Sequence, residues 1–128
     1  MMIIGLCLFV SFSFHVYAFL LESIWWTSRK AHKVFGVREE DAGKVAAFAY
    51  NQGFYNLLLA LSSAYGYYLM FFSKEKVDFG AGLLCASSIV QAGAGIVLVS
   101  TGGAKYIPVA CMQGLAPALI VYMTFEIR

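Results

Sequence analysis

The side chains best suited to chemistry in this sequence are an imidazole, a carboxyl group and several carboxamides, all set within or beside long apolar segments. His15 and Glu22 can exchange protons, which makes them the candidates for catalytic acid–base roles. Seven residues separate them, so an α-helix would place both on one face but about 10 Å apart along its axis. A joint action therefore needs a water, a substrate or a group from another helix between them.

The densest polar run is 51–56 (NQGFYN), inside a segment that carries no charge from residue 45 to residue 73. In a helix, residues four apart stack in columns, and Gly53 between two such columns lets another backbone come close. Unpaired polar groups are costly in hydrocarbon, so we expect this run to face protein or trapped water. Its candidate binding residues are Asn51, Gln52, Tyr55 and Asn56.

Three further side chains complete the candidate binding set: Trp26, Gln91 and Gln113. Trp26 follows Glu22 by four residues, on the same helical face. A single amide such as Gln91 is equally well explained as a link between helices. For Glu22 the competing interpretation is a carboxylate that extends from a helix end to the membrane interface.

Several classes of site are not predicted. The two histidines have no partner at metal-ligand spacing, so we expect neither a metal site nor a cofactor. No serine or cysteine has a basic residue at a spacing typical of nucleophilic catalysis. The three cysteines lie in apolar runs, and we expect them to be buried thiols. The net charge of +2, scattered along the chain, excludes a nucleic-acid-binding stripe.

Composition places the chain among all-α integral membrane proteins. Of its 128 residues, 61% are hydrophobic and 12% are charged, and the mean hydropathy is +0.75. We predict a single membrane domain over 1–128, built as an antiparallel bundle of four transmembrane helices. The predicted spans are 2–26, 45–72, 79–99 and 106–125. A cleavable signal peptide is the competing interpretation of the first segment, but no basic region precedes it.

Residues 27–44 form the one clearly polar segment. A solvated loop is the favoured interpretation and a short surface helix the alternative, with Asp41 as a cap for the helix that follows. With four spans, the side of the membrane that holds this loop carries six of the nine Lys and Arg residues (29, 30, 33, 38, 44 and 105). The positive-inside rule then predicts a cytoplasmic loop and both termini outside.

Residues 51–60 (NQGFYNLLLA) resemble the N-Q-G-x-Y-N-x-x-L-A signature of the domain-of-unknown-function 1304 family. That family also has a histidine and then a glutamate followed by tryptophan in its first span. His15 and Glu22 match these positions, with Trp25 or Trp26 as the tryptophan.

The resemblance extends to the last span, where 113–118 (QGLAPA) is similar to the family's Gln-x-x-Pro-Ala element but one residue longer. Leu57 stands where the family often has glycine. The resemblance implies a small multi-pass protein of the bacterial inner membrane, and it implies no activity.

Three functions remain open. The first is a polar intramembrane pocket that binds or converts a small amphiphile such as a quinone, an isoprenoid or a lipid. The second is a proton-coupled transporter acting as a homodimer, since one carboxylate in the first span resembles the small multidrug resistance proteins. The third is a non-catalytic scaffold stabilised by its amides. Membrane lipid is the expected partner in all three.

Overall fold

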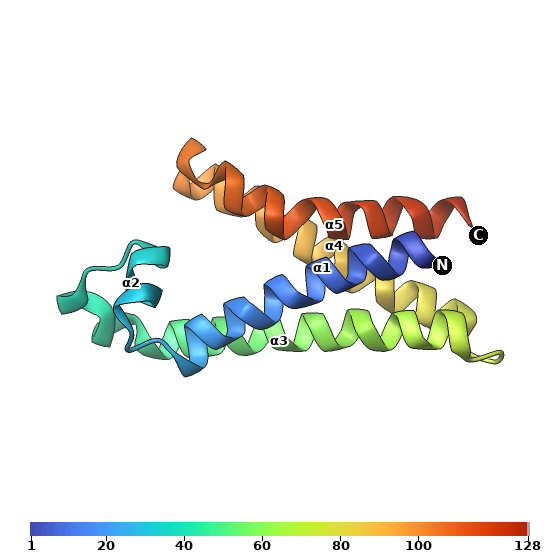
Figure 1. Ribbon diagram of the computed structural model, residues 1–128, viewed down its shortest axis with the longest axis horizontal. Coiled ribbons are helices and arrows are strands. Elements are labelled where there is room, and N and C mark those ends of the chain that lie inside the picture. Colours follow the sequence, from blue (N-terminus) through green and yellow to red (C-terminus); the bar gives the residue numbers. More distant parts are fainter. Residues whose placement is uncertain (128) are drawn as a thin grey trace.

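The computed structural model describes residues 1–127, which are helical except at short connections and contain no strand (Figure 1). Four of the helices are long. These are α1 (Met2–Phe19), α3 (Ala42–Phe72), α4 (Val77–Gly102) and α5 (Ile107–Glu126). A π-helical turn, η1 (Leu20–Ile24), extends α1, and the short helix α2 (Arg29–Phe35) follows. Two 3₁₀ turns, η2 (Glu39–Asp41) and η3 (Ala104–Tyr106), precede α3 and α5.

Each long helix runs opposite in direction to its neighbours (Figure 1). Helix α1 packs against α3 and α5, and α4 also packs against both of these. Both ends of the chain therefore lie at one end of the molecule, while α2 lies at the other. The observed helix boundaries fall close to the four segments expected from the sequence.

Three helical segments are long and apolar enough to cross a membrane: Met2–Ile24, Val77–Gly102 and Ala104–Glu126. They indicate a membrane protein and confirm the all-helical class. Helix α3 is the longest, at 31 residues, but its carboxamides and tyrosines make it less apolar than the other three. Its role as a fourth span stays a prediction.

Toward the chain termini, all four long helices contribute to an apolar core. It contains Ile4, Leu8, Met70, Ala81, Leu84 and Ile120. Helices α3 and α4 cross here with almost no space between their backbones. A methyl group added at Gly66 would lie 2.6 Å from the Leu84 amide nitrogen. Only glycine permits this approach.

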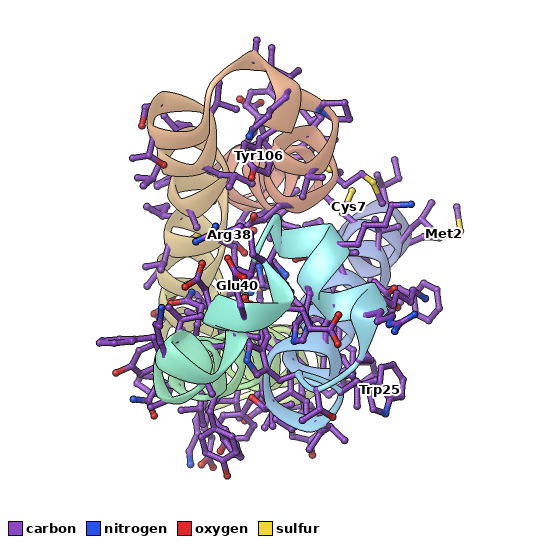
Figure 2. The ribbon with its side chains drawn as sticks, turned by 90° about the vertical axis from the view of Figure 1, so that its left-hand side faces the viewer. Met2, Cys7, Trp25, Arg38, Glu40 and Tyr106 are labelled. Carbon is purple, nitrogen blue, oxygen red and sulfur yellow. The ribbon has the colours of Figure 1, made fainter. Side chains whose placement is uncertain are left out.

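The segment predicted as a solvated loop, 27–44, is instead mostly helical. Ser28 caps α2 by accepting a hydrogen bond from the Ala31 amide at 3.2 Å, and Gly36 ends the helix at φ 66°. Figure 2, which looks onto this end of the molecule, shows the segment lying across the ends of the long helices. His32 is only 8% exposed. The short-helix alternative is the correct one, because aromatic packing holds α2 in place.

Asp41 does not cap α3 with its side chain, contrary to expectation. Its carboxylate accepts hydrogen bonds from Lys44 at 2.7 Å and from Arg38 at 2.8 Å. These two cations, Lys44 first, hold the pKa of Asp41 below its usual range. The competition from neighbouring cations explains why the helix amides receive no cap.

Candidate functional site

A cavity of about 430 Å³, lined by both polar and apolar side chains, lies between the four long helices. Helix α1 contributes one residue to it, α3 six, α4 two and α5 one. The lining residues are His15, Gln52, Tyr55, Asn56, Leu58, Leu59, Ser62, Val90, Ala94 and Gln113. We call this the main cavity. Five of the nine predicted site residues line it: His15, Gln52, Tyr55, Asn56 and Gln113.

His15 is fully buried, and its ring is fixed by its own helix. The Nδ1 atom lies 2.8 Å from the carbonyl oxygen of Ser11, one turn earlier. A carbonyl oxygen can only accept, so Nδ1 carries the proton in this bond. No residue in 1–127 provides a hydrogen-bond partner for Nε2. The imidazole therefore reaches the main cavity with one committed nitrogen and one free nitrogen.

Asn56 connects the main cavity to Glu22. It is 8% exposed, and its Nδ2 group donates to Glu22 Oε2 at 2.8 Å and to the Gln52 carbonyl oxygen at 3.2 Å. Both partners are acceptors in this arrangement, so the amide orientation follows from the hydrogen bonds. The NH₂ group is fully used, and Oδ1 remains as an acceptor.

Glu22 is 7% exposed and lies on the π-helical turn η1. The Trp25 amide donates to the carbonyl oxygen of Leu20, five residues back, at 2.7 Å. Such turns rotate the following side chains relative to an α-helix and often occur at functional sites. Here the turn directs Glu22 toward Asn56 on α3.

Gly53 makes this approach possible. A methyl group at residue 53 would meet Glu22 Cβ at 3.0 Å and the Phe19 carbonyl oxygen at 3.2 Å. The expectation that Gly53 admits a neighbouring backbone is confirmed. Ser23 adds a second link between η1 and α3 by donating to the Tyr50 carbonyl oxygen at 2.9 Å.

Glu22 lines a second, more open cavity of about 280 Å³, on the side of α2. Its other lining residues are Trp26, Phe35, Val45, Phe48, Ala49 and Gln52. Gln52 belongs to both cavities. His15 and Glu22 line different cavities, and Asn56, a group from another helix, stands between them. Their separation along the helix, together with the π-helical turn, explains this division.

Asn51 lies outside both of these cavities and is exposed. This contradicts the expectation that the whole amide run turns inward. A helix that directs Gly53 and Asn56 toward its neighbours turns Asn51 about 200° away from Gly53, since each residue rotates the helix by about 100°. Tyr55 is 60% exposed at the edge of the main cavity.

Gln91 is fully buried but lines neither cavity. Its Oε1 accepts a hydrogen bond from the Ser11 hydroxyl at 2.9 Å, and its Nε2 donates to Ser63 Oγ at 3.0 Å. Ser63 in turn lies 3.0 Å from Ser87 Oγ. The interhelical interpretation of Gln91 is the one the contacts favour. The three serines were missed because small hydroxyl residues within apolar runs give little signal.

Trp26 is held at the base of α2, where its Nε1 donates to the Ala42 carbonyl oxygen at 3.0 Å. Its ring meets His32 edge-on at 5.5 Å and lies 5.9 Å from that of Phe35. Trp25, in contrast, is 47% exposed and projects outward (Figure 2).

His32 is a buried titratable residue that the sequence interpretation left in a loop. Neither of its ring nitrogens has a hydrogen-bond partner among residues 1–127. Its spacing of three residues from Phe35, on one face of a short helix, is the signal that marks it as inward-facing. The described part of the chain also holds no group of three His, Cys, Asp or Glu residues arranged for a metal ion.

Together these contacts create a site that offers neutral hydrogen-bonding groups in one cavity and a carboxyl group in the next. Asn56 couples the two through a single hydrogen bond. Proton exchange at Glu22 would change the charge beside Asn56 without placing a charge among the residues that line the main cavity.

Comparison with known proteins gives one match. A family model described as a protein of unknown function (DUF1304) matches residues 9–125. No curated protein and no solved structure matches the chain. The matched range contains all of the site residues described above. The chain belongs to the DUF1304 family.

Proposed function

We propose that this protein binds a small amphiphile, such as a quinone, an isoprenoid or a lipid, in the main cavity. The observation that carries the proposal is His15, a fully buried imidazole whose free nitrogen belongs to a cavity-lining side chain. The cavity volume of about 430 Å³ falls in the range of small-molecule sites. Leu58, Leu59 and Val90 offer apolar contact for a tail, and the amides and imidazole offer contact for a head group.

The protein would act within a membrane that its four long helices cross as an antiparallel bundle. Helix α3 is about 46 Å long at 1.5 Å per residue, which exceeds a hydrocarbon core of about 30 Å. It is uncharged from residue 45 to residue 72 and packs beside α1 and α4, both of which qualify as spans. Large apolar side chains on the outer surface support contact with lipid, among them Phe9, Phe48, Ile96 and Met112.

The end that carries α2 would face the cytoplasm. This end holds the basic residues of 27–44 together with Lys105, and the positive-inside rule assigns such an end to the cytoplasm. Both termini would then lie outside, in the inner membrane of a bacterial cell. A reporter that fluoresces only in the cytoplasm, fused after Arg128, should stay dark, and a bright fusion would reverse the orientation.

A second candidate is a proton-coupled transporter that acts as a dimer. Gln52 lines both cavities, and the Glu22–Asn56 hydrogen bond lies where they meet. A ligand moving between the cavities would pass a titratable carboxyl group. A conversion reaction would draw on the same two residues, His15 in the main cavity and Glu22 behind Asn56.

The direct test is ligand binding to the purified protein in nanodiscs. Decylubiquinone, farnesol and dioleoylglycerol serve as one probe from each ligand class, with binding followed by native mass spectrometry and by thermal unfolding. A probe at one hundred times its Kd should stabilise the fold by about 2.7 kcal/mol. His15→Leu should weaken binding, because it removes the free ring nitrogen from the cavity.

Asn51→Leu is the matched control for this experiment. It removes a polar group from α3 outside both cavities, so binding should match that of the wild-type protein. The absence of binding by all three probes, or equal binding by the His15→Leu variant, would contradict the proposal. Glu22→Gln separates the two candidates. Loss of proton-coupled uptake with binding intact would favour the transporter.

A further inference from the structure

We infer that the ligand of the main cavity presents at least one uncharged hydroxyl group, whose hydrogen is donated to His15 Nε2 or to Asn56 Oδ1. The inference rests on the proposed function and adds the chemistry of the head group. It follows from two side chains, each more than nine-tenths buried, whose remaining hydrogen-bonding atoms can only accept.

For His15, the Ser11 carbonyl oxygen at 2.8 Å fixes the proton on Nδ1. In the neutral ring, Nε2 then carries a lone pair and no hydrogen. No described residue donates to this atom, and the described residues that hydrogen-bond or line the cavity around it include no carboxylate that would favour a second ring proton. A ligand that meets His15 must therefore donate to it.

For Asn56, the Glu22 carboxyl group and the Gln52 carbonyl oxygen use the two hydrogens of the amide. The amide cannot rotate to offer a hydrogen to the cavity without breaking both bonds. Its Oδ1 atom, which no described residue approaches as a donor, is the group left for a ligand. The atoms that His15 and Asn56 leave for a ligand are thus both hydrogen-bond acceptors, and both require a donor.

The requirement for a hydrogen-bond donor discriminates between head groups of similar shape. A carbonyl or ether oxygen placed against Nε2 and Oδ1 would bring lone pairs together and leave buried acceptors unpaired. Each hydroxyl hydrogen satisfies one of these acceptors, and the hydroxyl oxygen can itself accept from Gln52, Gln113 or Ser62, which all line the same cavity. Alcohols, phenols and hydroquinones fit this pattern, whereas their aldehydes, ethers and quinones do not.

An ammonium group is also a donor, but the cavity offers it no counter-charge. Its lining residues include no Asp or Glu. The carboxyl group of Glu22 lines the other cavity and accepts a hydrogen bond from Asn56. Burying a cation among neutral groups is costly, so an uncharged hydroxyl group is favoured.

Two ligand pairs test the inference in nanodiscs. Decylhydroquinone and decylbenzoquinone differ by the two hydroxyl hydrogens, and farnesol and farnesyl methyl ether differ at one. Dithionite is added only to the decylhydroquinone samples, where it prevents oxidation to the quinone, and native mass spectrometry reports the bound fraction. The hydroxyl member of at least one pair should bind about tenfold or more tightly than its partner, the size expected when a buried acceptor loses its donor. A preference within the first pair would indicate a phenolic hydroxyl group on the ligand, and a preference within the second pair an alcoholic one.

Substitution at His15 links the preference to the site. His15→Leu should reduce the binding ratio within the preferred pair toward one, whereas Asn51→Leu should keep the wild-type ratio. If His15→Leu does not fold, judged by its thermal unfolding, the ratios measured on the wild-type protein still decide the matter. Equal binding within both pairs, or tighter binding of the quinone or ether, would overturn this inference and leave the proposed function standing. No binding by any of the four compounds or by dioleoylglycerol would overturn both.

Discussion

Toward the chain termini the four long helices meet through Ile4, Leu8, Leu84 and Ile120, whereas toward α2 the same helices enclose a polar cavity. The first region has apolar side chains and backbones in close contact at Gly66. The second has an imidazole, carboxamides and a carboxyl group, joined by a few specific hydrogen bonds. The same helices thus build a close-packed apolar region and a region with buried polar side chains.

The two regions also use glycine differently. At Gly66 the neighbouring atoms are backbone atoms of α4, which cannot move without shifting a whole helix. At Gly53 they include the side chain of Ser23 and the Cβ of Glu22, on a π-helical turn. Close packing at Gly66 brings two helix backbones together, while close packing at Gly53 positions the carboxyl group of Glu22. This contrast predicts that stability and binding can be impaired separately.

The largest effect is expected from Gly66→Ala in the close-packed region. The added methyl group would lie 2.6 Å from the Leu84 nitrogen and 2.9 Å from the Gly80 carbonyl oxygen, so α3 and α4 must separate. Overpacking of this kind should cost about 3 kcal/mol of unfolding free energy. Thermal unfolding in nanodiscs measures it.

Gly82→Ala on α4 is the control, because a methyl group there meets nothing within 4 Å. It should leave stability unchanged or raise it by up to about 1 kcal/mol through helix propensity. Equal destabilisation by the two substitutions would show that the terminal region is not specifically packed.

The next effect is expected from Asn56→Leu in the cavity region. The change removes the donor to Glu22 Oε2 and leaves a buried carboxyl group without its partner. We expect a loss of about 1–3 kcal/mol in stability together with lost binding of the probe ligand. Asn51→Leu, on the exposed side of the same helix, should change stability by less than about 0.5 kcal/mol. Equal losses of stability and binding in the two variants would contradict the assignment of Asn56 to the inside of the bundle and of Asn51 to its outside.

The sequence predicted the ends of the long helices better than the arrangement of the cavity region. Apolar run lengths gave helix boundaries within a few residues, because hydrocarbon thickness and hydrophobicity determine them. The signature around residues 51–56 indicated the site, but assigning every amide to the inside assumed that a polar residue always avoids the surface. Asn51 shows that rotation about the helix, dictated by Gly53 and Asn56, decides instead.

The remaining features depended on contacts that a linear pattern does not contain. The π-helical turn at Glu22 inserts an extra residue that no periodicity argument anticipated, and it moved Glu22 out of the cavity of His15. The burial of His32 depends on Trp26, which lies outside α2. Aromatic packing therefore holds α2 in place within residues 27–44, and the charge pattern of this segment did not indicate it.

A smaller effect, confined to the α2 end, is expected from Trp26→Phe. The ring stays apolar, but the hydrogen bond from Nε1 to the Ala42 carbonyl oxygen is lost. We expect about 1 kcal/mol of lost stability and faster amide hydrogen exchange in residues 29–35, with the terminal core unchanged. Trp25→Phe is the control, since that exposed ring makes no hydrogen bond to the described residues. Unchanged amide exchange near Ile4 and Leu84 in both variants would show that the two regions are independent. Faster exchange near these residues in the Trp26→Phe variant would show that they are coupled.

The smallest effect is expected at Asp41, on the water-exposed side of the α2 end. Lys44 and Arg38 lower the pKa of its carboxyl group in the folded protein. Its contribution to stability is therefore present above the ordinary aspartate pKa of about 3.9 and is lost as the pH falls through the lower, folded-state value. Because the group is exposed, salt should weaken the effect. Asp41→Asn should remove this part of the acid dependence of thermal unfolding, whereas Glu39→Gln, an exposed carboxylate without an ion pair in the described chain, should retain it. An unchanged acid slope in Asp41→Asn would show that the acid sensitivity arises elsewhere, with the buried Glu22 and Asn56 pair as the next place to measure.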